Sequence, residues 1–205
     1  MTIYFGDGSN QTAAATGGKW TEISDASYSI DTNSGSGWGE NNITGLGGYD
    51  VLRLEFTHID FKRYSSRFDM RIGESSEGWA DSGYAYHHGI NKNGSPWQGG
   101  STSGSKIPFT NCGNGYTTDY SPPYHQTVKM EFWNWQGTTE YTNWEGTRFG
   151  FSRNDDRYGA WKEFFSGSTY RKWDFDRIQL QHPGVHQGSN YGPQTYRLRI
   201  LGASY

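Results

Sequence analysis

Five tryptophans are the side chains of this chain that are best suited to bind a sugar. An indole ring can stack on the C–H face of a pyranose, while neighbouring amides and carboxylates hydrogen-bond to its hydroxyls. The five lie in or near segments rich in turn-forming residues, with Asn, Gln, Asp and Arg close by: Trp97, Trp133, Trp135, Trp144 and Trp161. They predict a glycan-binding site, although the same rings could instead fill the hydrophobic core.

Two of these tryptophans follow a pair of apolar residues of opposite parity. Successive side chains of an extended chain point to opposite faces. Met130 and Phe132 therefore share one face, and Trp133 and Trp135 share the other. If the strand continues past Phe132, one pair lies in the core and the other pair lies outside it.

Glutamates in the same region could serve glycoside hydrolysis. Retaining glycosidases need two carboxyl groups roughly 5–5.5 Å apart. Glu131, in an aromatic-rich segment, is the first candidate, with Glu140, Glu145 or Glu163 as its partner. None of them lies in a sequence context typical of such enzymes. Solvated or ion-paired acids are therefore the preferred interpretation, and no catalytic residue is predicted.

The histidines do not have the spacing of a metal site. His87 and His88 are adjacent, so on a strand they point to opposite faces and cannot chelate one ion together. His182 and His186 have the i, i+4 spacing of a helical zinc pair, but Pro183 and the glycine after it preclude a helix there. No metal site is predicted from them.

The remaining reactive residues also lack a defining context. Cys112 is the only cysteine, and nothing beside it in the sequence suggests an activated thiol. Asp119, Asp155 and Asp156 could bind Ca²⁺ in loops, although no spacing demands it. We expect no cofactor.

Period-2 alternation identifies the elements that must position these side chains. Apolar residues alternate with polar ones in seven segments: 51–59, 67–72, 84–88, 127–132, 148–152, 176–180 and 196–200. Turn-forming residues dominate five stretches between them: 33–39, 73–78, 91–104, 111–123 and 182–193. Half-buried strands with long polar connections predict an all-β fold, an antiparallel β-sandwich that is jelly-roll-like. The domain spans 19–205, and 1–18 form a short extended leader with a flexible, small-residue linker.

Composition excludes several classes of protein. Aromatic residues make up 17% of the chain and there are 29 glycines without a collagen period, so aromatic rings must build much of the core. The net charge of −3 and the pI near 6.0 argue against a nucleic-acid partner. No apolar run approaches the roughly 18 residues needed for membrane insertion. One cysteine cannot form an intrachain disulfide.

The leader carries a resemblance to a known group of proteins. Residues 1–11, MTIYFGDGSNQ, are followed by a small-residue linker and by Gly17-Gly18-Lys19. This string resembles the leader of virion structural proteins of marine tailed phages, cyanophages in particular. The body is similar to β-sandwich modules of such proteins at 48–54, 68–72, 83–86 and 196–202.

The resemblance implies a non-enzymatic virion surface protein, made in the host cytoplasm. It implies a tail fibre or receptor-binding tip that contacts a host-surface glycan through aromatic-rich loops. The leader, with Ile3, Tyr4 and Phe5, would attach it to other virion proteins, and the domain would form a homotrimer. Two alternatives stay open: a capsid decoration or knob protein without a receptor role, and a carbohydrate-active enzyme that hydrolyses polysaccharide.

Overall fold

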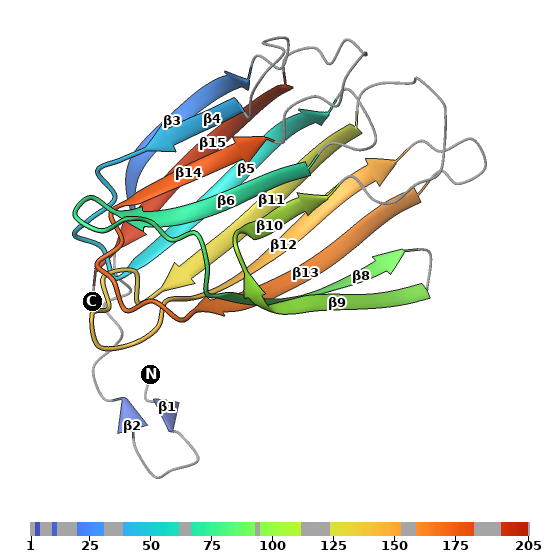
Figure 1. Ribbon diagram of the computed structural model, residues 1–205. Helices are drawn as coiled ribbons and strands as arrows, with labels where there is room; N and C mark the ends of the chain where they lie inside the picture. The colour runs from blue at the N-terminus through green and yellow to red at the C-terminus, as the bar shows by residue number, and fades with distance from the viewer. Residues whose placement is uncertain are drawn as a thin grey trace.

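The described part of the protein consists of antiparallel β-strands and their connections (Figure 1). The structure is a computed structural model that describes residues 3–4, 10–11, 20–30, 39–61, 67–92, 95–111, 124–152, 159–182 and 194–204. None of these residues forms a helix long and apolar enough to cross a bilayer. The prediction of an all-β fold is confirmed.

A large, eight-stranded sheet forms one layer of the sandwich. Its strands follow one another in the order β3 (Thr21–Ile30), β15 (Gln194–Ala203), β5 (Val51–Phe61), β11 (Tyr124–Trp133), β12 (Asn143–Ser152), β13 (Gly159–Thr169), β8 (Tyr84–Lys92) and β9 (Ser95–Gly104). The three consecutive strands β11, β12 and β13 form a meander at its centre.

A smaller sheet forms the second layer. Its order is β10 (Ile107–Asn111), β6 (Arg67–Glu74), β14 (Arg177–His182) and β4 (Gly39–Ile43), and the short β7 (Gly78–Trp79) pairs with β6. Near the N-terminus, β1 (Ile3–Tyr4) and β2 (Asn10–Gln11) pair with each other as a separate two-stranded sheet.

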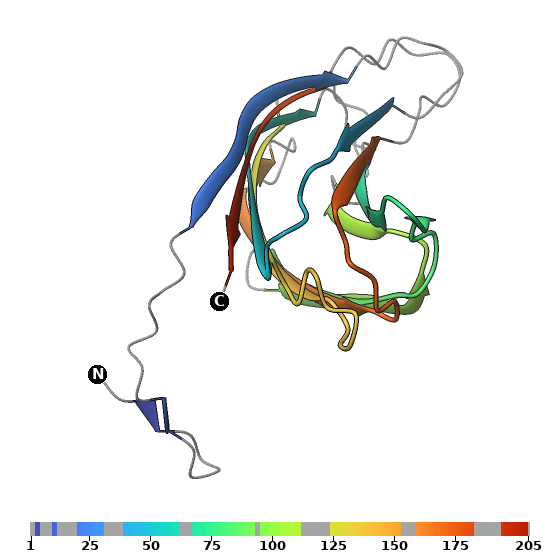
Figure 2. The same cartoon turned by 90° about the vertical axis from the view of Figure 1, so that its left-hand side faces the viewer.

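The chain passes repeatedly from one sheet to the other. It leaves the large sheet after β3, β5, β9 and β13 to enter the small sheet, and it returns at β5, β8, β11 and β15. Figure 2 shows the large sheet curving around the small one. This alternation gives the jelly-roll-like sandwich that the sequence predicts.

The hydrophobic core lies between the facing sides of the two sheets. Leu52, Leu54 and Phe56 of β5 are fully buried, as their alternation predicts. The small sheet contributes Met70 and Ile72 from β6, which are also fully buried. In β5 the intervening residues at 53, 55 and 57 are instead partly exposed on the outer face, whereas Asp69 of β6 is buried.

Aromatic rings supply much of this core. Trp144 contacts Tyr84 and Phe132, with ring centroids 6.1 Å and 6.2 Å apart, and Trp135 lies 5.3 Å from Phe132. A glycine at position 167 makes room for this packing, because a Cβ there would collide with the Trp144 ring. Large rings thus replace the aliphatic side chains that the composition lacks.

Several strands were not predicted from alternation: β3, β4, β9, β10 and β13. The segment 91–104 was predicted as a connection, but it holds the end of β8 and all of β9. That prediction is wrong, because β9 is held by backbone pairing with β8, from Tyr84↔Gly104 to Lys92↔Ser95, despite its small polar residues. In β13 the alternation is hidden, since the polar Glu163 is buried and the apolar Phe164 is exposed.

Candidate functional site

An open groove of about 560 Å³ lies on the outer face of the large sheet. It is formed where β8, β11, β12 and β13 lie side by side. Its walls carry side chains that can stack and hydrogen-bond: His87, Glu131, Glu145, Thr147, Phe164 and Ser166. Because these residues belong to the paired strands of one sheet, their relative positions are fixed by backbone hydrogen bonds.

Two phenylalanines present exposed rings on this face. Phe164 of β13 is 53% exposed and Phe149 of β12 is 47% exposed, whereas an apolar ring on a strand ordinarily faces the core. The Lys162 ammonium lies over both rings, 4.4 Å from the centroid of Phe164 and 5.2 Å from that of Phe149. This cation–π arrangement holds the rings in place while leaving them accessible.

Two carboxylates lie directly opposite each other in the groove. Glu131 of β11 is the register partner of Glu145 of β12, and both line the groove. The Arg53 guanidinium donates a hydrogen bond to Glu131, with Nε and Oε1 2.8 Å apart, and lies 4.1 Å above the ring centroid of Trp20. Among the described residues, none forms an ion pair with Glu145.

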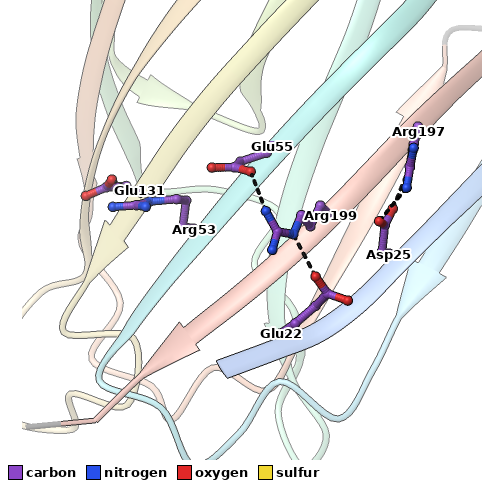
Figure 3. A network of polar contacts seen from close by, with 7 residues as sticks. All are labelled: Glu22, Asp25, Arg53, Glu55, Glu131, Arg197 and Arg199. Carbon is purple, nitrogen blue, oxygen red and sulfur yellow. Dashed lines mark hydrogen bonds and ion pairs between the residues drawn. The ribbon is translucent and has the colours of Figure 1, made fainter. Parts of the chain in front are cut away.

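Beyond Arg53 the same face carries a ladder of ion pairs (Figure 3). Arg199 of β15 lies between Glu22 and Glu55, with N–O distances of 2.7 Å and 3.6 Å. Arg197 forms a two-pronged hydrogen bond with Asp25, at 2.7 Å and 2.6 Å, and this bond lowers the pKa of the Asp25 carboxyl. Charges on β3, β15 and β5 thus neutralise one another.

Two of the predicted glycan-binding tryptophans lie in the core. Trp135 is 0% exposed and Trp144 is 1% exposed, so neither offers a ring face to a sugar, and the prediction is corrected for both. The strand ends at Trp133, and Asn134 adopts a left-handed conformation with φ of 55°, which breaks the alternation. The chain turns inward, and the Trp135 indole donates a hydrogen bond to the Leu46 carbonyl at 3.0 Å.

Of the other three tryptophans, the structure describes the side chain of Trp133 alone. Trp133 is half-buried and stands on the outer face, opposite in parity to the buried Met130 and Phe132. Trp97 belongs to β9 and Trp161 to β13, but their side chains lie outside the described residues. Their role in glycan binding stays a prediction.

The remaining partners considered for Glu131 lie elsewhere. Glu140 is exposed in the turn between β11 and β12, where it accepts a hydrogen bond from Asn134. Glu163 points into the sandwich and pairs with the buried Arg148. Burial raises the pKa of Glu163, and Arg148 opposes this rise. Only Glu145 therefore shares the groove with Glu131.

Other predicted residues add little to this site. His87 lines the groove, but the side chain of His88 is not described. Cys112, Asp119, Asp155 and Asp156 lie outside the described residues, as does Phe5 of the leader, whereas Ile3 and Tyr4 form β1. Within the described ranges, no three His, Cys, Asp or Glu residues are arranged to hold a metal ion.

Sequence reasoning missed the exposed aromatics of β12 and β13. Phe164 and Phe165 are adjacent, so on a strand they must point to opposite faces, and one of them has to leave the core. Phe149 likewise has the same parity as Glu145 and Thr147, which marks it as an outward residue. These two patterns in the sequence indicate that Phe149 and one of the adjacent phenylalanines of β13 face outward.

Comparison with known proteins does not identify a family. No protein-family model matches the chain, and a search of curated proteins finds no match. The fold and the site define the class: an antiparallel β-sandwich with an open, aromatic-flanked groove on the outer face of its large sheet.

Proposed function

We propose that this chain is a non-enzymatic virion surface protein that binds a host-surface glycan in the groove between β8 and β11. The observation that carries the proposal is the exposed Phe164 ring, set beside carboxylate and hydroxyl groups on rigid strands. Small-molecule sites combine apolar surface with a few well-placed polar groups in this way. The virion role is supported by the resemblance of the leader.

The side chains of the groove suit a ligand rich in hydroxyls. Carboxylates such as Glu131 and Glu145 accept hydrogen bonds from sugar hydroxyls, and Thr147 and Ser166 both donate and accept them. Lys129 also lines the groove, so charges of both signs are present. This mixture favours polar recognition of an uncharged sugar over attraction of one sign of charge.

In this proposal the glycan contacts a face of the sheet and not the loops. Strands β12 and β13 hold the rings of Phe149 and Phe164 in place before the ligand binds, so little conformational entropy is lost on binding. Each contact is weak on its own, and several copies on one particle would raise the overall avidity.

Binding of the purified protein to a panel of immobilised polysaccharides and bacterial lipopolysaccharides tests the glycan site. We expect Phe164→Ala to weaken retention about tenfold, because it removes the stacking surface. Arg197→Ala is the matched control, since Arg197 is also exposed on the outer face of the large sheet but lies in the ion-pair ladder. An equal loss of retention in both variants, or no loss in either, would contradict the proposal.

Competition with phage adsorption tests the virion role. A receptor-binding tip should block adsorption when the purified protein saturates the host surface. A capsid decoration protein would leave adsorption unchanged and co-purify with tail-less capsids.

Deletion of residues 1–16 tests the role of the leader and should leave a folded domain that no longer enters virions. Sedimentation of the full chain tests the oligomeric state and should give a trimer.

Hydrolysis of polysaccharide is a second candidate function, favoured by one observation. Glu131 and Glu145 are register partners on neighbouring strands, a placement that brings their Cβ atoms about 4.5–5.5 Å apart. A glycosidase would release sugar from polysaccharide, and Glu131→Gln and Glu145→Gln would each abolish that release. A binding protein would release none, and both variants would retain much of their affinity.

A further inference from the structure

We propose that the glycan site extends from the groove along the β12–β13 hairpin to a second aromatic platform, formed by Tyr141 and Tyr170. The ligand is then an internal segment of a linear polysaccharide rather than a single terminal sugar. This inference rests on the proposed function of the groove and names the kind of glycan that it would accept.

The register of β12 and β13 lines up one continuous row of outward side chains. Going from Phe149 toward the open end of the hairpin, the facing pairs are Phe149↔Lys162, Thr147↔Phe164, Glu145↔Ser166 and Asn143↔Ser168. Their neighbours in sequence, among them Trp144, Glu163 and Phe165, are buried on the opposite face. The row therefore lies on one solvent-facing surface.

The two tyrosines continue this row beyond the ends of the strands. The Thr169 amide donates a hydrogen bond to the Thr142 carbonyl at 3.0 Å, so the pairing extends by one residue pair past Asn143↔Ser168. Thr142 and Thr169 are both buried, which turns the next residues, Tyr141 and Tyr170, outward. Their rings meet edge to face, with centroids 6.2 Å apart and planes at 82°.

Both tyrosine rings are exposed although their backbone is held firmly. Tyr141 is 44% exposed and Tyr170 is 54% exposed. The Tyr170 amide donates to the Gly83 carbonyl at 2.8 Å, and the side-chain amide of Asn143 donates to the Tyr141 carbonyl at 3.1 Å. The Lys172 ammonium lies 5.1 Å from the Tyr141 ring centroid. An exposed and preorganised ring pair is a surface suited to stacking a sugar.

The two platforms are separated by a polar stretch. Phe164 and Tyr170 are six positions apart, which corresponds to about 20 Å along an extended chain. Between them the row presents carboxylate, amide and hydroxyl groups from Glu145, Asn143 and two serines, at 166 and 168. A single sugar ring contacts one platform only, whereas a chain of several rings contacts both and offers hydroxyls to the stretch between.

Calorimetric titration with linear oligosaccharides of increasing length tests this inference. The probes are gluco-, manno- and galacto-oligosaccharides, from the disaccharide to the hexasaccharide. We expect affinity to rise with length until the chain spans both platforms. Tyr141→Ala and Tyr170→Ala should each weaken binding of the hexasaccharide several-fold and leave the disaccharide unaffected, whereas Phe164→Ala should weaken both. The thermal midpoint of each variant verifies that it is folded.

Two results would overturn the inference without touching the proposed function. One is binding of the wild-type protein that does not depend on oligosaccharide length. The other is that both tyrosine variants are retained on polysaccharide as strongly as the wild-type protein. Failure of the wild-type protein to bind any polysaccharide or lipopolysaccharide of the panel would overturn the proposed function, and the extended site with it.

Discussion

The outer face of the large sheet has two halves, one in which charged side chains form ion pairs and one in which aromatic rings are exposed. On β3, β15 and β5, acidic and basic residues form ion pairs with one another, as Arg199 does with Glu22 and Glu55. On β12 and β13, Phe149 and Phe164 are exposed beside Glu145, which forms no ion pair with a described residue. Beneath β12 and β13 the inner face also holds the buried ion pair of Arg148 and Glu163.

The difference indicates where this sheet can bind a ligand. Ion pairs that are complete within the sheet leave few groups to recognise a partner, and exposed pairs contribute little to stability. A contiguous group of exposed apolar rings on a folded surface marks a site where a partner can bind. We call β12 and β13 the aromatic half of this face, and β3, β15 and β5 the charged half.

Removal of a core tryptophan should have the largest effect on stability. Trp144→Ala should lower the free energy of unfolding by about 3–5 kcal/mol, because it leaves a large cavity beneath the aromatic half. Trp133→Ala is the matched control, since Trp133 is only half-buried on the outer face. Urea unfolding measures both. Similar losses in the two variants would contradict the division between inner and outer faces.

Loss of both exposed phenylalanines should affect binding and spare stability. Phe149→Ala with Phe164→Ala should weaken glycan retention by about 1.5–3 kcal/mol, from the apolar area removed. The free energy of unfolding should change by less than about 1 kcal/mol, because both residues are already 47% and 53% exposed in the folded chain. Affinity electrophoresis and urea unfolding give the two values. A large loss of stability would show that the rings hold the fold.

Arg53 lies at the boundary between the two halves and positions a groove carboxylate. Arg53→Met should weaken glycan binding about two- to fivefold, because Glu131 loses the guanidinium that orients it. Arg199→Met, in the ladder, should leave binding unchanged. An equal effect of both substitutions on the dissociation constant would show that the two halves act as one surface.

In the charged half, a substitution should change how the stability of the fold depends on pH and should not change ligand binding. Arg197 lowers the pKa of Asp25 in the folded chain, so the pair stabilises the fold above the unfolded pKa of Asp25, near 3.8, and loses this contribution as the pH falls through the folded pKa. Arg197→Gln should therefore be slightly less stable than the wild type at neutral pH. The two proteins should converge in acid. Unfolding midpoints that differ equally at both pH values would contradict this.

The sequence predicted the fold better than it predicted the site. Alternation in 51–56 correctly assigned which residues face the core, because β5 is central and half-buried, whereas at 130–135 it left open which parity faces inward. It failed at Trp135, since the left-handed Asn134 reverses parity at a point that periodicity cannot reveal. It also failed at Trp144, which is buried because Gly167 opposite leaves room for its ring. Such packing depends on a partner strand that is remote in sequence.

The aromatic half was missed for a related physical reason. In β13 the inward Glu163 is compensated by Arg148 from the neighbouring strand, so a polar residue lies where alternation expects an apolar one. The outward Phe164 then breaks the pattern a second time. Departures from local rules are most frequent at functional sites, and these two departures lie beside the groove.

Mapping of a bound oligosaccharide by backbone amide chemical shifts tests the central claim most directly. On titration with the longest oligosaccharide that binds, we predict shifts concentrated in 143–149 and 162–170. Residues 21–30 and 194–203 should shift little. Shifts confined to the charged half of the sheet, or to neither half, would contradict the assignment of the aromatic half as the binding surface.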